Sequence, residues 1–222
     1  MTPERYKKLQ YILNSRQPDL TILMEELHKP RNFAAILRSC DAVGTLEAHA
    51  VAPEGIPFNR PKAAAGSTRW VKIRRHNTIE ESVAELKSRG MKLIAAHPSP
   101  QALDFRDYDY TQPTAIIMGS ELAGLSDKAL EMTDDVVVIP MQGMVQSLNV
   151  SVSAALILFE AQRQRKAAGL YDQRHIDDAT YDKLLFEWGY PKLAHFYRQR
   201  ALTYPPLDKE SGGLIRDAIT IR

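Results

Sequence analysis

The sequence predicts an α/β domain built on a mostly parallel sheet with helices on both faces. Strand-like and helix-like segments alternate between residues 20 and 168. Several of the strand-like segments, such as Thr114–Met118, are short apolar runs without polar alternation, as in strands buried on both faces. Loops that carry glycine or proline follow three of these segments, and this is where ligands bind in open α/β sheets.

Local signals set the expected boundaries of each element. Gly44, Gly90 and Gly169 each follow a helix-like stretch in the manner of a C-cap. Thr78 and Glu81 have the spacing of a capping box. The expected elements are, in order, a basic amphipathic helix over residues 3–16, strand Leu20–Leu27, helix Asn32–Val43, strands Glu47–Val51 and Trp70–Arg74, a helix from Thr78 to Gly90, strands Lys92–Ala96, Thr114–Met118 and Val136–Ile139, and helix Asn149–Ala168.

The composition changes after Gly169, where the continuous apolar pattern gives way to short helix-like stretches and a polar tail. We therefore expect three segments: an N-terminal basic helix over residues 1–17, a catalytic α/β domain over residues 18–168 and a helical extension over residues 169–222.

Bulk properties indicate an ordinary globular protein, with 44% hydrophobic residues and a formal net charge of +2. Cys40 is the single cysteine, which suits a reducing cytoplasm. The N-terminus lacks the apolar core of a secretory signal, and no stretch approaches the ~20 apolar residues of a spanning helix. No cysteine or histidine spacing indicates a metal site. We expect a cytoplasmic protein without metal or membrane.

The first segment that could carry chemistry is the loop from Gly119 to Ser126. Its two glycines and its serine partly match a phosphate-binding P-loop, but Leu125 stands where the phosphate-binding lysine would be. Glu121 would also repel phosphate. The loop therefore suits a ligand without phosphates, although by itself it favours a plain turn that caps the next helix.

The second segment joins a buried strand to the longest helix. Ser147 and Asn149 are both suitable N-cap residues for that helix. Capping does not explain the loop residues Met141, Gly143 and Met144, which offer soft apolar surface and free backbone groups for a ligand. The helix itself is apolar on most faces, which indicates burial in the core or in a subunit interface.

Basic residues supply the remaining candidates. Arg38 lies in a mostly apolar helix that Asn32 could cap, so it is either a salt-bridged structural residue or a site residue directed at an anion, and the structural interpretation is favoured. Basic clusters also occur in the N-terminal helix, between residues 55 and 79, and at the end of the longest helix. They are either solvated faces or an RNA-binding surface. The candidates for RNA contact are Lys8, Arg16, Arg163 and Arg165.

In combination, three segments resemble the three motifs of the SpoU branch of the SPOUT class of RNA ribose 2′-O-methyltransferases. They are HKPRNFAAILR at residues 28–38, IMGSELAGL at residues 117–125, and the stretch from Ile139-Pro-Met to Ser147-Leu-Asn-Val-Ser-Val-Ser-Ala-Ala155. The resemblance continues into Leu185–Pro191, where it favours the tRNA guanosine-18 enzymes over the ribosomal RNA members.

This resemblance implies a trefoil knot in the C-terminal half of the domain, a homodimer, and a pocket for S-adenosyl-L-methionine within the knot. It implies that the donor is bound by Ala96, Met118, Gly119, Ile139, Met141, Ser147 and Leu148. It implies that the catalytic polar residues are Asn32, Arg38, Glu121, Ser147 and Asn149.

The implied reaction is methyl transfer to the ribose 2′-hydroxyl of guanosine 18 in tRNA. Arg38 would act either as the base that activates this hydroxyl or, as we favour, by holding a substrate phosphate and stabilising charge on the oxygen, because guanidinium is rarely deprotonated. The alternatives are a ribosomal RNA 2′-O-methyltransferase and a non-catalytic RNA-binding protein of the same fold. A nicotinamide-dependent oxidoreductase is disfavoured, since no G-x-G-x-x-G follows a strand.

Overall fold

The computed structural model describes residues 1–27, 29–52, 67–120 and 123–215, and they form two compact units. One unit spans Gln17–Leu170, and the other combines Met1–Arg16 with Tyr171–Arg222. The boundaries expected at residues 17 and 168 lie within two residues of those between the units. The N-terminal helix and the C-terminal extension, which we expected as separate segments, belong to a single unit.

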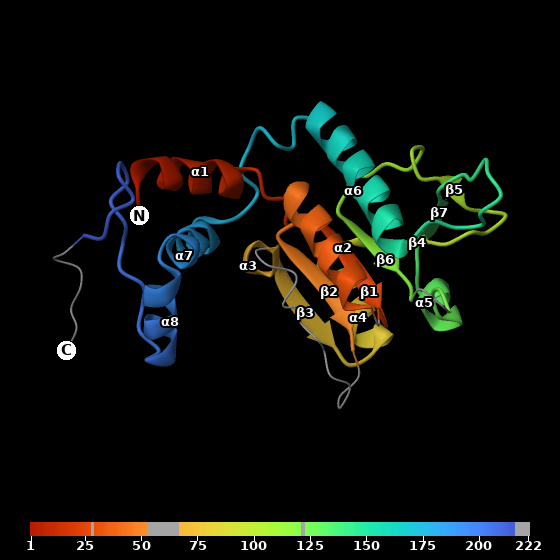
Figure 1. Ribbon diagram of the computed structural model, residues 1–222, viewed down its shortest axis with the longest axis horizontal. Helices are drawn as coiled ribbons and strands as arrows, with labels where there is room; N and C mark the ends of the chain where they lie inside the picture. The colour runs from red at the N-terminus through yellow and green to blue at the C-terminus, as the bar shows by residue number, and fades with distance from the viewer. Residues whose placement is uncertain (28, 53–66, 121–122, 216–222) are drawn as a thin grey trace. The chain divides into compact units, whose positions relative to one another are not determined.

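The larger unit is built on a parallel sheet of seven strands, which confirms the predicted α/β class (Figure 1). The strand order across the sheet is β3-β2-β1-β6-β4-β7-β5. The strands are β1 (Leu20–Glu25), β2 (Glu47–Val51), β3 (Lys72–His76), β4 (Lys92–Ala96), β5 (Leu103–Asp104), β6 (Thr114–Met118) and β7 (Asp135–Val138).

Helices cover both faces of this sheet. The helices α2 (Pro30–Ala42) and α6 (Val150–Ala167) pack together on one face, whereas α4 (Ile79–Ser88) and the short α5 (Asp127–Glu131) cover the other (Figure 1). Side chains of each strand alternate between the two cores: in β6, Ile116 packs on the α2 and α6 side and Ile117 on the α4 and α5 side.

The predicted boundaries of these elements are correct to within two residues, and two of the larger differences have local causes. Trp70 belongs to a short helix, α3 (Ser67–Trp70), so β3 starts at Lys72. The helix α2 begins at Pro30 and not at Asn32, because proline is well suited to the first position of a helix. Thr78 caps α4 as expected, accepting a hydrogen bond from the backbone N–H of Glu81 at 3.2 Å.

The smaller unit consists of α1 (Pro3–Asn14), α7 (Asp178–Gly189) and α8 (Pro191–Gln199) with the segment that follows. Its core is aromatic: the rings of Phe186 and Tyr204 stack with centroids 4.5 Å apart. The amino group of Met1 donates to the Tyr190 hydroxyl at 2.7 Å, which ties the start of the chain to this core. None of the helices in the described ranges is long and apolar enough to cross a membrane.

The strand order determines where a ligand site can form. The strands β6, β4 and β7 are direct neighbours, so their carboxyl ends and the three loops that follow them meet at one edge of the sheet. These are the loops that the sequence indicated as the default site. The trefoil knot stays a prediction from the resemblance.

Candidate functional site

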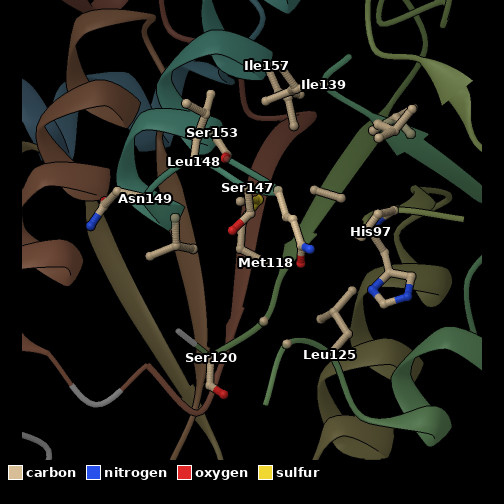
Figure 2. Close-up of a pocket in the computed structure, with 18 of the residues that line it drawn as sticks. His97, Met118, Ser120, Leu125, Ile139, Ser147, Leu148, Asn149, Ser153 and Ile157 are labelled. Carbon is tan, nitrogen blue, oxygen red and sulfur yellow. The ribbon is translucent and has the colours of Figure 1, made fainter. Parts of the chain in front are cut away.

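The loops after β4, β6 and β7 line a cavity of about 590 Å³ at the carboxyl ends of these strands (Figure 2). Apolar side chains such as Val137 and Ile157 contribute to its lining. The seven residues expected at the donor pocket all line this cavity: Ala96, Met118, Gly119, Ile139, Met141, Ser147 and Leu148. The fold therefore brings these residues, which are up to 52 positions apart in the sequence, together in the way that the motifs indicated.

The lining also includes residues that were not expected at the donor pocket, among them three polar ones. His97 follows β4 directly, and Ser153 lies in the first turn of α6 (Figure 2). Lys29 precedes α2. His97 carried no prediction of its own, although it directly follows a buried strand. The position of Lys29 depends on the path of the chain after β1, and no local pattern indicates it.

In the loop after β6, the backbone at Gly119 lies close to the backbone at Gly124 and Leu125. A Cβ atom added at this residue would lie 2.2 Å from the backbone carbon of Gly124 and 2.4 Å from the backbone nitrogen of Leu125. Backbone hydrogen bonds between Ser120 and Gly124, at 2.9 and 3.1 Å, hold the two segments together. Only glycine fits at position 119, so backbone and not side-chain atoms form this wall of the cavity.

Asn149 connects the cavity to α2. Its side-chain oxygen accepts hydrogen bonds from the backbone N–H of Ser151 at 2.9 Å and from the Ser151 hydroxyl at 2.6 Å, so Asn149 is the N-cap of α6. Its side-chain nitrogen donates to Asn32 Oδ1 at 3.3 Å. Of the two N-cap candidates, Ser147 is left with its side chain at the cavity (Figure 2).

Arg38, a further catalytic candidate, lies outside this hydrogen-bonded pair. Asn32 is 8% exposed, whereas Arg38, on the same helix, is exposed to solvent. Six residues separate them, which corresponds to about 9 Å along a helix axis. Arg38 is not among the described residues that line the cavity. Glu121 lies outside the described residues.

Comparison with known proteins assigns the family. The model of the SpoU rRNA Methylase family matches residues 19–159, and a second model, the C-terminal SpoU rRNA methylase region, matches residues 163–217. The chain belongs to the SpoU methylase family.

Individual members of the SpoU family resemble the chain over most of its length. The tRNA (guanosine(18)-2′-O)-methyltransferase of Escherichia coli is 49% identical over 212 residues, which covers 95% of this chain and 93% of the relative. The enzyme of the same name from Thermus thermophilus is 52% identical over 189 residues, with coverage of 84% and 96%.

Solved structures of SpoU proteins share the fold. The Aquifex aeolicus TrmH/SpoU tRNA modifying enzyme has a TM-score of 0.79 and 38% identity, and the match covers 86% of this chain and 97% of that one. The SpoU methyltransferase AviRb of Streptomyces viridochromogenes, solved in complex with the cofactor AdoMet, has a TM-score of 0.61 and 30% identity, with coverage of 69% and 62%.

Two of the four basic residues expected to contact RNA in this SpoU chain are buried, and this corrects the prediction. Arg165 is 0% exposed, and its guanidinium donates to backbone carbonyls of Tyr110 and Gln112. Arg16 is 1% exposed, with its guanidinium 5.1 Å from the ring centroid of Trp188. Both lie near helix ends, where a count of basic residues does not show which side chains turn inward. Lys8 and Arg163 are exposed.

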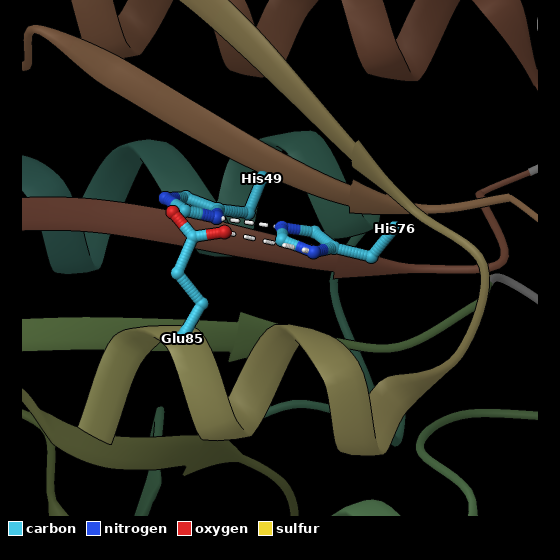
Figure 3. A group of neighbouring side chains, drawn as sticks. All are labelled: His49, His76 and Glu85. Carbon is cyan, nitrogen blue, oxygen red and sulfur yellow. Dashed lines mark hydrogen bonds and ion pairs between the residues drawn. The ribbon is translucent and has the colours of Figure 1, made fainter. Parts of the chain in front are cut away.

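A second polar cluster lies on β2, β3 and α4 of the SpoU chain (Figure 3). It contains His49, His76 and Glu85, whose ligand atoms lie within 4.8 Å of one another. His49 Nδ1 is 2.9 Å from His76 Nε2, and the planes of the two rings are nearly parallel, with an angle of 7° between them. The two nitrogen atoms thus face each other in a hydrogen bond and do not converge on a third point as metal ligands do at about 2 Å.

The surroundings of this cluster offer both donors and acceptors. His49 Nε2 lies 3.5 Å from the donor Arg89 Nη1 and 3.5 Å from the acceptor Glu47 Oε1. His76 Nδ1 faces Glu85 Oε2 at 4.0 Å. Burial lowers the pKa of His76 and the neighbouring His49 lowers it further, so the His76 ring is neutral at physiological pH.

Glu47 completes this arrangement at the edge of the cluster. Burial would raise the pKa of its carboxyl group, but hydrogen bonds with His49, Arg74 and Arg89 outweigh that effect and hold the pKa well below its usual range. Arg74 also pairs with Glu85 at 2.9 Å. Since guanidinium groups already neutralise both carboxylates, the cluster serves to tie β2, β3 and α4 together.

Proposed function

We propose that this SpoU protein transfers a methyl group from S-adenosyl-L-methionine to the ribose 2′-hydroxyl of guanosine 18 in tRNA. The observation that carries the proposal is the cavity at the ends of β4, β6 and β7, which gathers all seven residues expected at the donor pocket. Relatives of 49% and 52% identity with this named activity support the choice of substrate. A chain that methylates tRNA acts in the cytoplasm.

The cavity fits the proposed donor in size and chemistry. Its volume of about 590 Å³ lies in the usual range for sites that bind a small molecule or cofactor. The close approach of the backbone at Gly119 leaves N–H and C=O groups to recognise polar atoms of the donor. When bound, the donor would supply a methyl group on a sulfonium. The ribose 2′-hydroxyl would lose its proton to solvent as the carbon–oxygen bond forms, and the carbon–sulfur bond would break to leave a neutral thioether.

The residues of the chain contribute by positioning and by excluding water. Met118, Ile139 and Leu148 give the cavity a weakly polar lining, which favours a reaction in which a sulfonium cation and a developing alkoxide lose their charges. Alignment of the oxygen with the methyl carbon supplies about 7–11 kcal/mol of the barrier reduction in well-oriented reactions. The Asn149–Asn32 hydrogen bond fixes the start of α2 relative to this lining.

Arg38 is the proposed contact to the RNA at the reacting sugar. Its exposed guanidinium holds a substrate phosphate and stabilises the developing charge on the 2′-oxygen, while Asn32 orients the helix that carries it. The alternative role, a deprotonated guanidine that acts as base, predicts a rate that rises with pH to a plateau and loses this dependence in Arg38→Lys. A pH–rate profile that is the same in both proteins, with a lower rate for the variant, supports the electrostatic role.

We also propose that the protein is a homodimer through α6. Val152, Leu156 and Phe159 are 46%, 40% and 47% exposed, and their spacing places them along one side of the helix. Leu156→Glu should convert the dimer into a monomer in analytical ultracentrifugation. Leu202→Glu is the matched control, since Leu202 is 45% exposed and lies elsewhere. A dimer that survives in Leu156→Glu would rule out this interface.

Ribosomal RNA is the second candidate substrate, because the matching family models carry that name. The match to tRNA enzymes over 93% of the length of the E. coli relative favours tRNA. Purified protein with labelled donor should methylate bulk tRNA and leave ribosomal RNA unlabelled. Label in ribosomal RNA alone would replace the proposed substrate, and label in neither would favour a non-catalytic RNA-binding protein.

A further inference from the structure

We infer that Glu25 is a positioning residue of the donor pocket, because its carboxylate holds the loop between β6 and α5 against the end of β1. This inference rests on the proposed function. Glu25 is the last residue of β1 and is 7% exposed. It does not line the cavity itself, so any effect on the donor is transmitted through the loop.

Both carboxylate oxygens of Glu25 accept hydrogen bonds from one residue of that loop. Oε2 accepts from the backbone N–H of Ser126 at 2.9 Å, and Oε1 accepts from the Ser126 hydroxyl at 2.6 Å. The Ser126 hydroxyl oxygen in turn accepts from the backbone N–H of Ala129 at 3.1 Å and caps α5. Hydrogen bonds to a carboxylate are short and strong, so this pair fixes Ser126 in two directions.

The position of Ser126 determines the wall of the cavity. Its neighbour Leu125 lines the cavity and is 7% exposed. Gly124, the next residue toward β6, has a left-handed backbone with φ of +71°. Its backbone N–H donates to the Ser120 carbonyl, and its carbonyl accepts from the Ser120 N–H. A shift of Ser126 therefore moves the backbone that closes over Gly119.

Glu25 also stands where the chain turns toward α2. Glu26, the next residue, has a positive φ of 48°, a strained conformation for a residue with a side chain. The turn leads to Lys29, which lines the cavity, and to Asn32, which is bound to Asn149. The buried carboxylate of Glu25 thus links the end of β1 to the loop after β6. It does so just before the turn that leads to α2.

Amide hydrogen exchange in the donor-free protein tests the inference without the reaction. In Glu25→Ala, peptides that cover residues 123–130 should exchange faster than in the wild type, because Ser126 loses both of its hydrogen bonds to the Glu25 carboxylate. Glu26→Gln is the matched control, since it changes an adjacent exposed carboxylate and should leave these peptides unchanged. Equal exchange in the wild type and Glu25→Ala would overturn the inference.

Donor binding by calorimetry gives the second readout. Loosening of the wall should weaken S-adenosyl-L-methionine binding about 10–100-fold in Glu25→Ala. At saturating donor, kcat and the KM for tRNA should stay within about threefold of the wild type, because Glu25 touches neither reactant. Glu25→Gln should recover most of the affinity, since its amide offers one acceptor and one donor to Ser126.

The outcomes separate the inference from the proposed function. Tight donor binding by both the wild type and Glu25→Ala would overturn the role of Glu25 and leave the proposed function standing. A wild type that binds no donor would overturn both. A double-mutant cycle of Glu25→Ala with Ser126→Ala should give a loss of affinity well below the product of the single losses, and independent effects would contradict the pairing.

Discussion

Arg165 Nη1 lies 2.6 Å from Asp19 Oδ1, and this ion pair joins the last turns of α6 to the start of β1. The guanidinium also donates to backbone carbonyls of Tyr110 and Gln112, so each of its three nitrogens has a partner. A buried cation bound in this way stabilises the packing of the unit and is not available to RNA.

Arg165→Met should therefore lower the free energy of unfolding by about 3 kcal/mol, because it leaves the carbonyls of the β5–β6 connection without donors. Arg163→Met is the control: Arg163 is exposed and pairs with Glu160 in solvent, so the loss should be much smaller. Urea unfolding measures both. Equal stability of the two variants would contradict the structural role of Arg165.

Asn149 has two functions that substitutions can separate. Asn149→Ser keeps an N-cap oxygen for α6 but is too short to reach Asn32, whereas Asn149→Ala loses both interactions. Asn149→Ala should lose about 1 kcal/mol of stability, and Asn149→Ser almost none. Both should lower the rate of methyl transfer to a similar extent. Full activity of Asn149→Ser would show that the bond to Asn32 has no part in catalysis.

Gly119 and Gly124 differ in why they must be glycine. Gly119→Ala creates a backbone clash and should weaken donor binding about 100-fold or more. Gly124→Ala meets no atom within 4 Å and only introduces strain at φ of +71°, at a cost of about 1 kcal/mol. Isothermal titration with the donor and thermal unfolding measure the two effects. Stronger loss of donor binding in Gly124→Ala than in Gly119→Ala would contradict this assignment.

The His49–His76 pair predicts a loss of stability in mild acid. Burial first, and then His49, lower the pKa of His76 against the opposing charges of Glu85 and Glu81. The unfolded chain therefore binds a proton at about pH 6.5, where the folded protein still excludes it. Stability should be full above that pH and fall as the pH decreases toward the lowered pKa of His76. Urea midpoints measured from pH 8 to pH 5.5 test the slope, and His76→Gln should flatten it. An unchanged slope in this variant would assign the effect to other groups.

The sequence predicts well those features that depend on neighbouring residues. Short apolar runs predicted the bounds of β4 and β6 without error. Thr78 and Asn149 are the N-caps of α4 and α6, as predicted. The two-residue strand β5 was missed, because two residues carry no periodicity.

Contacts between distant residues were beyond local reasoning. His49 and His76 are 27 positions apart, and Glu25 and Ser126 are 101 positions apart. Arg165 was taken for a surface residue because its helix end is basic, but its partners Tyr110 and Asp19 lie 55 and 146 positions earlier. The strand pattern predicted the three loops of the donor pocket, and the resemblance supplied the full set of pocket residues.

The central claim is that the protein methylates one sugar oxygen of tRNA. The most direct test uses two tRNA transcripts that differ only in carrying a 2′-deoxy nucleotide at position 18 or at position 19. With purified protein and labelled S-adenosyl-L-methionine, the transcript with 2′-deoxyguanosine at position 18 should accept no methyl group, and the other should accept about one per molecule, as expected for a single reacting hydroxyl. Equal labelling of both transcripts would contradict the account.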